Sequence, residues 1–135
     1  MSASGDSVGM VSERARVLVI GLDPHRVPGP WDPEPVAAAL RRAAEQFTDA
    51  GIDATSCLVG LDGSDDIPVV VAAALAQGPW DCVVIGGGIR HSEVQVELFE
   101  EIINLVHRLA PDASIAFNAT VDDIVTAAQR RLGRA

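Results

Sequence analysis

Residues 80–92 read WDCVVIGGGIRHS, an apolar run followed by three glycines and a basic pair. The run is continuous and rich in β-branched residues, so residues 81–85 are predicted to form a strand buried on both faces of a parallel sheet. Glycines between such a strand and a helix are typical of a ligand-binding turn in an open α/β sheet. The stretch therefore predicts an α/β fold with a ligand-binding crevice beside this turn.

The rest of the chain alternates between strand and helix patterns in the same way. Strands are predicted at residues 16–22, 52–59, 81–85 and 114–118, and helices at 32–50, 67–77, 92–109 and 120–132. The first and third strands are continuous apolar runs and are predicted to be central, whereas the more polar second strand is predicted at an edge. Right-handed crossovers then favour the order 2-1-3-4 with helices on both faces. This is a doubly wound, four-stranded parallel sheet in a three-layer α/β/α fold, flavodoxin-like or Rossmann-like.

Capping signals mark the predicted helix starts. Asp32 is expected to cap the first helix, with Pro33 in its first helical position. Ser92 and Gln95 match a capping box at the start of the third helix, and Thr120 is expected to cap the last.

Length and composition limit the class of protein. The 135 residues predict a single domain over residues 14–135, after a flexible tail at residues 1–13 that shows no periodicity. No apolar run is long enough to span a membrane and no secretory signal is evident, so a cytoplasmic protein without a membrane partner is expected. The net charge of −9 argues against nucleic acid as a partner.

Two residue types are missing, and this excludes several chemistries. All ten basic residues are arginine, which excludes a Schiff-base lysine, a phosphate-loop lysine and the lysine of receiver domains. The absence of tyrosine excludes the tyrosine acids of many reductases. Cys57 and Cys82 fall within predicted strands and are expected to be small buried apolar residues in a reducing compartment.

Three loops are expected to meet at the carboxyl edge of the first and third strands, where doubly wound sheets bind ligands. Glycines let backbone amides approach a ligand closely, and arginine can hold a carboxylate or phosphate through two hydrogen bonds. We therefore expect a small anionic ligand, although the sequence identifies no cofactor. The predicted ligand-binding residues are Arg26, Gly86, Gly87, Gly88, Arg90, Asn118 and Thr120.

Asp23, His25 and His91 are the candidate catalytic residues, because carboxylate and imidazole groups at one edge could act as acid and base. His25 would titrate near neutral pH, with Asp23 orienting it and Arg90 holding an anionic group. Such an enzyme would be an isomerase, lyase or hydrolase rather than an oxidoreductase. The same side chains could ligate a metal, but no third ligand stands at a suitable spacing, so no metal site is predicted.

Each of these interpretations has a structural alternative. The three glycines could serve only as a tight turn, and Arg90 could pair with Asp23 or Asp62. Asp23 could cap its own loop while His25 and Arg26 point into solvent. A different class of function is also open: the wide apolar face of residues 92–109 could make the chain a non-catalytic interaction module that forms a homodimer.

The sequence does not match several known cofactor or phosphorylation sites of this fold class. The first strand is followed by Gly-Leu-Asp-Pro rather than by G-x-G-x-x-G, which excludes a full NAD site. The Ser- and Thr-rich phosphate loop of flavodoxins is missing, and the third strand ends in glycine rather than in the aspartate of receiver domains.

Two resemblances to known families can be stated. Residues 21–25 followed by Gly29 resemble the Asp-x-His-x-x-Gly loop of cobalamin-binding domains, which implies that His25 would ligate cobalt. Gly29 comes one residue late, with Pro28 in its place, and the serine loop and late double glycine of that family are absent. As a whole, the chain is similar to a family of small single-domain bacterial and fungal proteins without an assigned activity. That similarity rests on residues 19–24, 81–90 and 116–120, and it implies the fold without adding chemistry.

Overall fold

The computed structural model describes residues 14–91 and 95–133. Its elements in chain order are β2 (Arg16–Leu22), the 3-10 helix η2 (Pro24–Arg26), α1 (Glu34–Asp49), β3 (Asp53–Val59), α2 (Ile67–Leu75), β4 (Cys82–Ile85), α3 (Gly87–Arg90), α4 (Val96–Leu109), β5 (Ser114–Phe117), the 3-10 helix η4 (Val121–Asp123) and α5 (Ile124–Leu132). None of the helices within these residues is long and apolar enough to cross a membrane.

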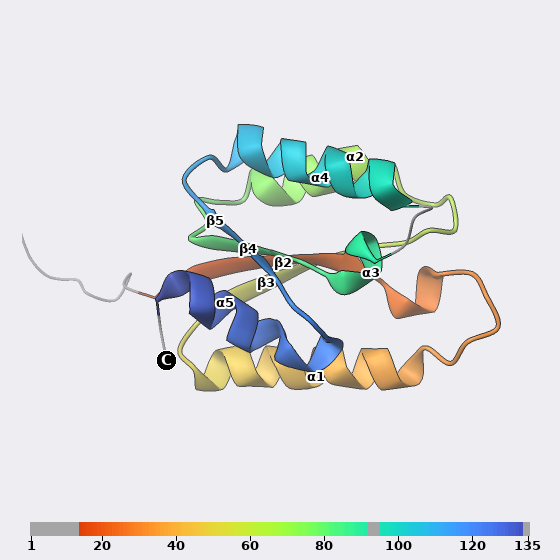
Figure 1. The fold of residues 1–135 in the computed structure, drawn as a ribbon, viewed down its shortest axis with the longest axis horizontal. Coiled ribbons are helices and arrows are strands. Elements are labelled where there is room, and N and C mark those ends of the chain that lie inside the picture. The colour runs from red at the N-terminus through yellow and green to blue at the C-terminus, as the bar shows by residue number, and fades with distance from the viewer. Residues whose placement is uncertain (1–13, 92–94, 134–135) are drawn as a thin grey trace, which may run out of the picture.

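The four strands form one sheet in the order β3-β2-β4-β5, and all three pairings are parallel. Helices α1 and α5 cover one face of this sheet, and α2 and α4 cover the other (Figure 1). The predicted three-layer, doubly wound α/β fold with the order 2-1-3-4 is therefore confirmed. The strand order reverses between β2 and β4, so the topological switch point lies at their carboxyl ends.

The central strand β2 is buried on both faces. Val17 and Val19 pack into the core beneath α1 and α5, whereas Leu18 and Ile20 pack into the core beneath α2 and α4. This alternation follows from the period of two in a strand, which sends successive side chains to opposite faces. Strand β4 is buried in the same way along its whole length. Two apolar faces explain why both strands read as continuous runs in the sequence.

Strand β3 lies at an edge of the sheet, as its polar residues predicted. Asp53, Thr55 and Ser56 are exposed, and only Cys57 and Val59 near its carboxyl end are buried. Polar side chains on an exposed edge hinder pairing with another chain.

Three helix starts differ from the sequence prediction in detail. Helix α1 begins at Glu34, one residue later than expected, and Asp32 accepts a hydrogen bond from the Glu34 amide at 3.0 Å. The helix predicted at residues 92–109 is present as α4, which begins at Val96, and the preceding glycine turn contains the short helix α3; the predicted cap Ser92 lies outside the described residues. Thr120 forms a capping box with Asp123, but it caps the turn η4 that leads into α5.

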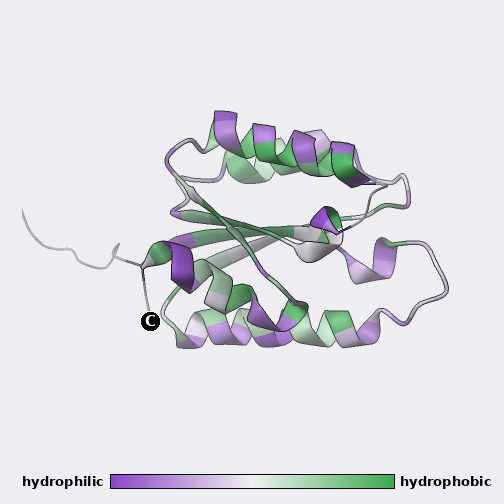
Figure 2. Ribbon diagram, viewed as in Figure 1, coloured by the Kyte–Doolittle hydropathy of each residue, from purple (hydrophilic) through white to green (hydrophobic). Residues whose placement is uncertain are grey.

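The wide apolar face of α4 is used largely within one chain. Ile102, Leu105 and Val106 are buried in the core shared with α2 and the sheet, and hydrophilic residues of α4 lie on its outer side (Figure 2). Val96 and Leu109 at the two ends of the helix remain exposed. The homodimer stays a prediction, but packing against α2 and the sheet already accounts for most of the apolar face that motivated it.

Both cysteines are buried and free, as predicted for small apolar residues in strands. They lie in opposite cores: Cys57 faces α2 and α4, and Cys82 faces α1 and α5. Burial disfavours the thiolate and raises the pKa of the Cys82 thiol to about 11. Neither cysteine therefore has the electropositive, accessible surroundings of a reactive thiol.

The contrast between central and edge strands gives a stability test. Ile20→Ala removes a fully buried side chain of β2 and should lower the free energy of unfolding by about 2–5 kcal/mol. Thr55→Ala changes an exposed position of β3 and should cost about 1 kcal/mol or less. Chemical denaturation of both variants measures the difference, and equal losses would contradict the assignment of β2 to the centre of the sheet.

Candidate functional site

A pocket of about 340 Å³ lies at the carboxyl ends of β2 and β4. This is the edge at which the sequence predicted a crevice. Its residues come from β2 and β3, the loop after β2, the start of α1, the α3 region, and the segment from Asn118 into α5. The lining residues are Val19, Gly21, Leu22, Pro24, Val27, Trp31, Val36, Leu40, Leu58, Gly86, Gly87, Gly88, His91, Asn118, Ala119, Thr120, Val121 and Ile124.

The glycines bring two strand ends close together at the floor of the pocket. A Cβ on Gly86 would lie 3.3 Å from both Gly21 Cα and the Ile20 carbonyl oxygen, so a side chain there would force β2 and β4 apart. The Gly86 amide donates to Ile20 O at 2.8 Å and continues the pairing past β4. Gly86 thus allows close strand approach, and a side chain there would need these backbone atoms to shift by a few tenths of an ångström.

Gly87 and Gly88 line the pocket, and neither adopts a left-handed conformation. Gly87 begins α3 and is not among the positive-φ glycines of the described residues, so a left-handed conformation at Gly87 is ruled out. A Cβ on Gly87 would lie 3.0 Å from a ring carbon of His91, which is exposed and able to move. The run is a strand-to-helix turn whose second and third glycines leave room for His91 and Leu22.

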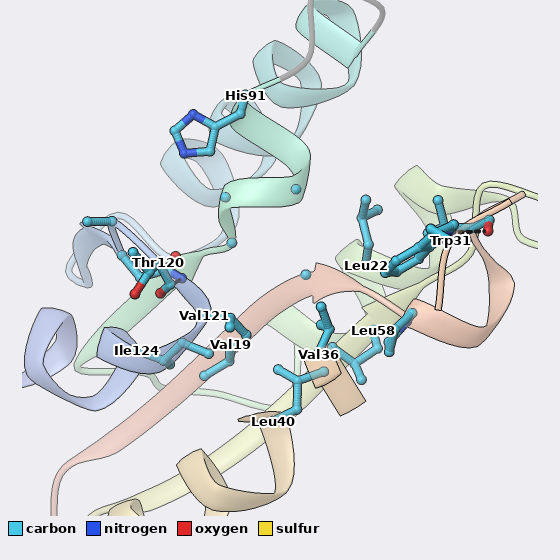
Figure 3. Close-up of a pocket in the computed structure, with 18 residues that line it drawn as sticks. Val19, Leu22, Trp31, Val36, Leu40, Leu58, His91, Thr120, Val121 and Ile124 are labelled. Carbon is cyan, nitrogen blue, oxygen red and sulfur yellow. Dashed lines mark hydrogen bonds between the residues drawn. The ribbon is translucent and has the colours of Figure 1, made fainter. Parts of the chain in front are cut away.

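Apolar side chains form most of the pocket wall. Val36 and Leu40 reach it from the first turns of α1, close to Val19 of β2 and Leu58 of β3 (Figure 3). Trp31 comes from the long Pro- and Gly-rich loop after β2, and its indole Nε1 donates to Val27 O at 3.0 Å. That bond folds the loop back on itself and holds it as one wall of the pocket.

The polar lining residues lie on the side of the pocket opposite this apolar wall. His91 and Thr120 lie together on one side of the pocket, away from Trp31 (Figure 3). Asn118 is 4% exposed, and its side-chain Nδ2 donates to Thr120 O at 2.7 Å. The Thr120 hydroxyl accepts from the Asp122 amide at 3.2 Å, which places it at the start of η4. The pocket therefore has an apolar side and a smaller polar side.

Arg90, the predicted anion-binding residue, does not line this pocket. Its Nε donates to Ile85 O at 3.1 Å, its Nη2 donates to Asn118 O, and the guanidinium lies 5.1 Å from the ring centroid of Phe117. The side chain pairs with neither Asp23 nor Asp62, the two partners considered from the sequence. Arg90 instead joins the carboxyl ends of β4 and β5.

Arg26 is also outside the pocket and is held by protein groups. Its Nε lies 3.0 Å from Asp23 Oδ2, its Nη1 lies 2.7 Å from Asp65 Oδ2, and its Nη2 donates to Leu58 O at 3.2 Å. Asp65 in turn accepts from the Gly60 amide at 2.8 Å. Arg26 thus ties the loop after β2 to the loop after β3.

Asp23 and His25 do not form the predicted acid/base pair. Asp23 accepts from the backbone amide of His25 at 3.0 Å and from Arg26, and these bonds lower the pKa of its carboxyl, with Arg26 as the largest cause. His25 is exposed and does not line the pocket. Asp23 therefore caps its own loop, as the structural alternative expected. The same alternative expected Arg26 to point into solvent, and this is wrong, because its guanidinium donates to Asp23, Asp65 and Leu58 O.

Of the three candidate catalytic residues, only His91 lines the pocket. Within residues 14–91 and 95–133, no group of three or more His, Cys, Asp or Glu side chains is placed to hold a metal ion. The cobalamin-like loop also lacks support at His25. A metal-ligating histidine usually donates its second ring nitrogen to a carboxylate or carbonyl, and Asp23 contacts the backbone of His25 instead.

A scan of the chain against protein-family models finds no match, and a search of curated proteins also finds none. The resemblances noted from the sequence therefore remain predictions. The pocket geometry is the basis for a functional assignment.

Sequence reasoning missed the apolar wall of the pocket. Val36 and Leu40 lie at helical spacing within the predicted helix at residues 32–50, and nothing in the helical period separates core contacts from pocket contacts. The sequence signal that could have revealed this wall is Trp31, a tryptophan within a long loop after the first strand, at the edge where ligands bind in this fold.

The Arg26 network gives a prediction with a pH dependence. Arg26→Ala should lower the melting temperature at pH 7, because it removes a bond from both Asp23 and Asp65, whose pKa values are lowered in the folded state. Carboxyls with lowered pKa stabilise the fold above their unfolded pKa of about 4, and this stability is lost as the pH falls through the folded values. The difference between wild type and variant should therefore shrink below about pH 4.

The control for this experiment is Arg41→Ala. Arg41 forms one exposed ion pair with Glu34, at 2.8 Å, and exposed pairs contribute little to stability. Thermal melts from pH 2.5 to 8 compare the two variants. A pH-independent difference for Arg26→Ala would contradict the electrostatic role of the network.

Proposed function

We propose that the chain binds a small molecule in the pocket at the carboxyl ends of β2 and β4. One observation carries the proposal: a cavity of about 340 Å³ with mostly apolar walls and a few polar groups lies at the switch point of a doubly wound sheet. Ligand sites commonly combine apolar walls with a few polar groups that orient the ligand, and the switch point is where such sheets bind ligands.

The size and lining of the pocket favour a compact ligand. Ligand pockets span about 300–1,000 Å³, so this one is near the lower limit and suits a molecule of one or two rings. Trp31, Leu22 and Leu58 offer apolar contact to such a body, with His91 and Thr120 on the other side. An anionic group, which the sequence predicted, would have to lie at the mouth near His91, because Arg26 and Arg90 donate to protein oxygens elsewhere.

Binding without catalysis is favoured over an enzyme. His91 is the one titratable side chain among the described lining residues, and neither Asp23 nor His25 is there to pair with it. General acid–base chemistry needs a group within hydrogen-bond reach of the reacting proton, usually with a second group to orient it. Self-association is a weaker candidate, since α2 and the sheet cover most of the apolar face of α4.

Val36→Phe tests whether the pocket is the binding site. The substitution puts a larger side chain into the wall, and a ligand found by thermal-shift screening should lose about tenfold or more in affinity. The screen should include nucleobases, aromatic amides and acids, and sugar phosphates. Isothermal titration of each hit then measures the change.

Val69→Phe is the matched control. Val69 occupies the third position of α2, as Val36 does in α1, and each follows a proline. Val69 is 61% exposed and lies in the opposite helical layer, so its variant should keep full affinity. The absence of any hit, or equal binding by both variants, would reject the pocket as the binding site.

A further inference from the structure

The amide of Asn118 is fixed by its neighbours at the end of β5. Asn118 directly follows β5, is 4% exposed, and is one of the residues that line the pocket. Its Nδ2 donates to Thr120 O at 2.7 Å. A backbone carbonyl can only accept, so the amide cannot be turned to place its oxygen there. The orientation leaves Oδ1 as the free end of the side chain.

Asn118 Oδ1 is buried, and no group of residues 14–91 or 95–133 donates a hydrogen bond to it. Buried polar atoms in folded proteins are nearly always paired, because an unpaired acceptor forfeits its bonds with water without compensation. An acceptor left unpaired beside a pocket is therefore best explained by a partner that comes with a ligand.

We propose that Asn118 Oδ1 accepts a hydrogen bond from an uncharged N–H or O–H group of the ligand, whose apolar body fills the rest of the pocket. This inference rests on the proposed binding function and names the chemistry of its ligand. Contact with the buried oxygen needs a local adjustment of the rim. His91 is exposed at this rim, so its side chain can turn, whereas Thr120 stays bonded to Asn118 and Asp123.

The charge of the surroundings selects a neutral donor. Ionised carboxylates and phosphates carry only acceptor oxygens and would repel Oδ1. A cationic amine would lack a counter-charge, because no Asp or Glu is among the described lining residues. Amides, lactams and heterocycles with an N–H group satisfy both conditions, and their planar bodies match apolar walls that include Trp31 and Leu22.

Three probes that share one naphthalene body separate these cases: 2-naphthamide, N,N-dimethyl-2-naphthamide and 2-naphthoate. The primary amide is a neutral donor, the dimethylamide lacks the donor, and the naphthoate is an anion with acceptors only. Titrations followed by ¹H–¹⁵N NMR give the affinities and track the Asn118 side-chain amide. We expect 2-naphthamide to bind about tenfold more tightly than either of the others and to shift the Asn118 amide resonance.

Asn118→Leu should remove this preference while keeping the fold. The substitution removes the unpaired Oδ1 together with the Nδ2 bond to Thr120 O, so the melting temperature should fall by a few degrees, and the ¹H–¹⁵N spectrum verifies that the variant is folded. Asn104→Leu is the matched control, because Asn104 is exposed on α4 and its amide bonds only within that helix, to Glu100 O at 2.8 Å. That control should keep the tenfold preference.

The outcomes distinguish the inference from the function on which it rests. Binding that Val36→Phe weakens, but with equal affinity for the three probes or a preference for the naphthoate, overturns the neutral-donor inference and leaves the binding function intact. A preference that survives Asn118→Leu also overturns it. No binding of any probe at millimolar concentration overturns the neutral-donor inference, and the binding function fails as well only when the wider thermal-shift screen also gives no hit.

Discussion

The parallel pairing of β2 with β4 is the constraint on which the rest of the structure depends. Both strands are buried on both faces, so each must carry apolar residues throughout, and each needs a helical layer above and below. The pairing also reverses the strand order at this place, and the chain leaves β2 and β4 toward different neighbours. A gap between the departing loops follows from that topology, and Gly21 with Gly86 keeps the strand ends close enough for one pocket to span them.

The arginines explain why this pocket is uncharged in an acidic protein. Parallel strands end in carbonyl groups that need donors, and the loops after them carry several carboxylates. Arg90 satisfies carbonyls at Ile85 and Asn118, and Arg26 satisfies Leu58 O together with Asp23 and Asp65. A guanidinium has five N–H donors in a fixed plane, so one side chain can hold two or three acceptors at once. The same geometry that would suit an anionic ligand is used to fix the loops around the pocket.

The sequence predicted the fold better than the site, for a physical reason. Periodicity reports which face of a strand or helix is buried, and that was enough for the sheet order, the edge position of β3 and the buried cysteines. It also placed Gly86, Asn118 and Thr120 at the correct edge. The direction of a loop side chain depends on which nearby hydrogen-bond partners compete for it. Periodicity carries no information about that competition. Asp23 was predicted to orient the His25 side chain, but its carboxylate accepts from the His25 backbone amide and from Arg26 instead.

Asn118 shows how that same local competition can leave a group available to a ligand. Its Nδ2 is taken by Thr120 O, two residues on, and its own carbonyl is taken by Arg90. Both bonds fix the residue at the point where β5 ends and the chain turns into η4. The side-chain oxygen is buried and receives no hydrogen bond from the described residues, and it is held in place by the bonds on either side. A ligand donor would meet an acceptor whose position is already fixed on folding, and the adjustment that it requires would fall on the rim of the pocket.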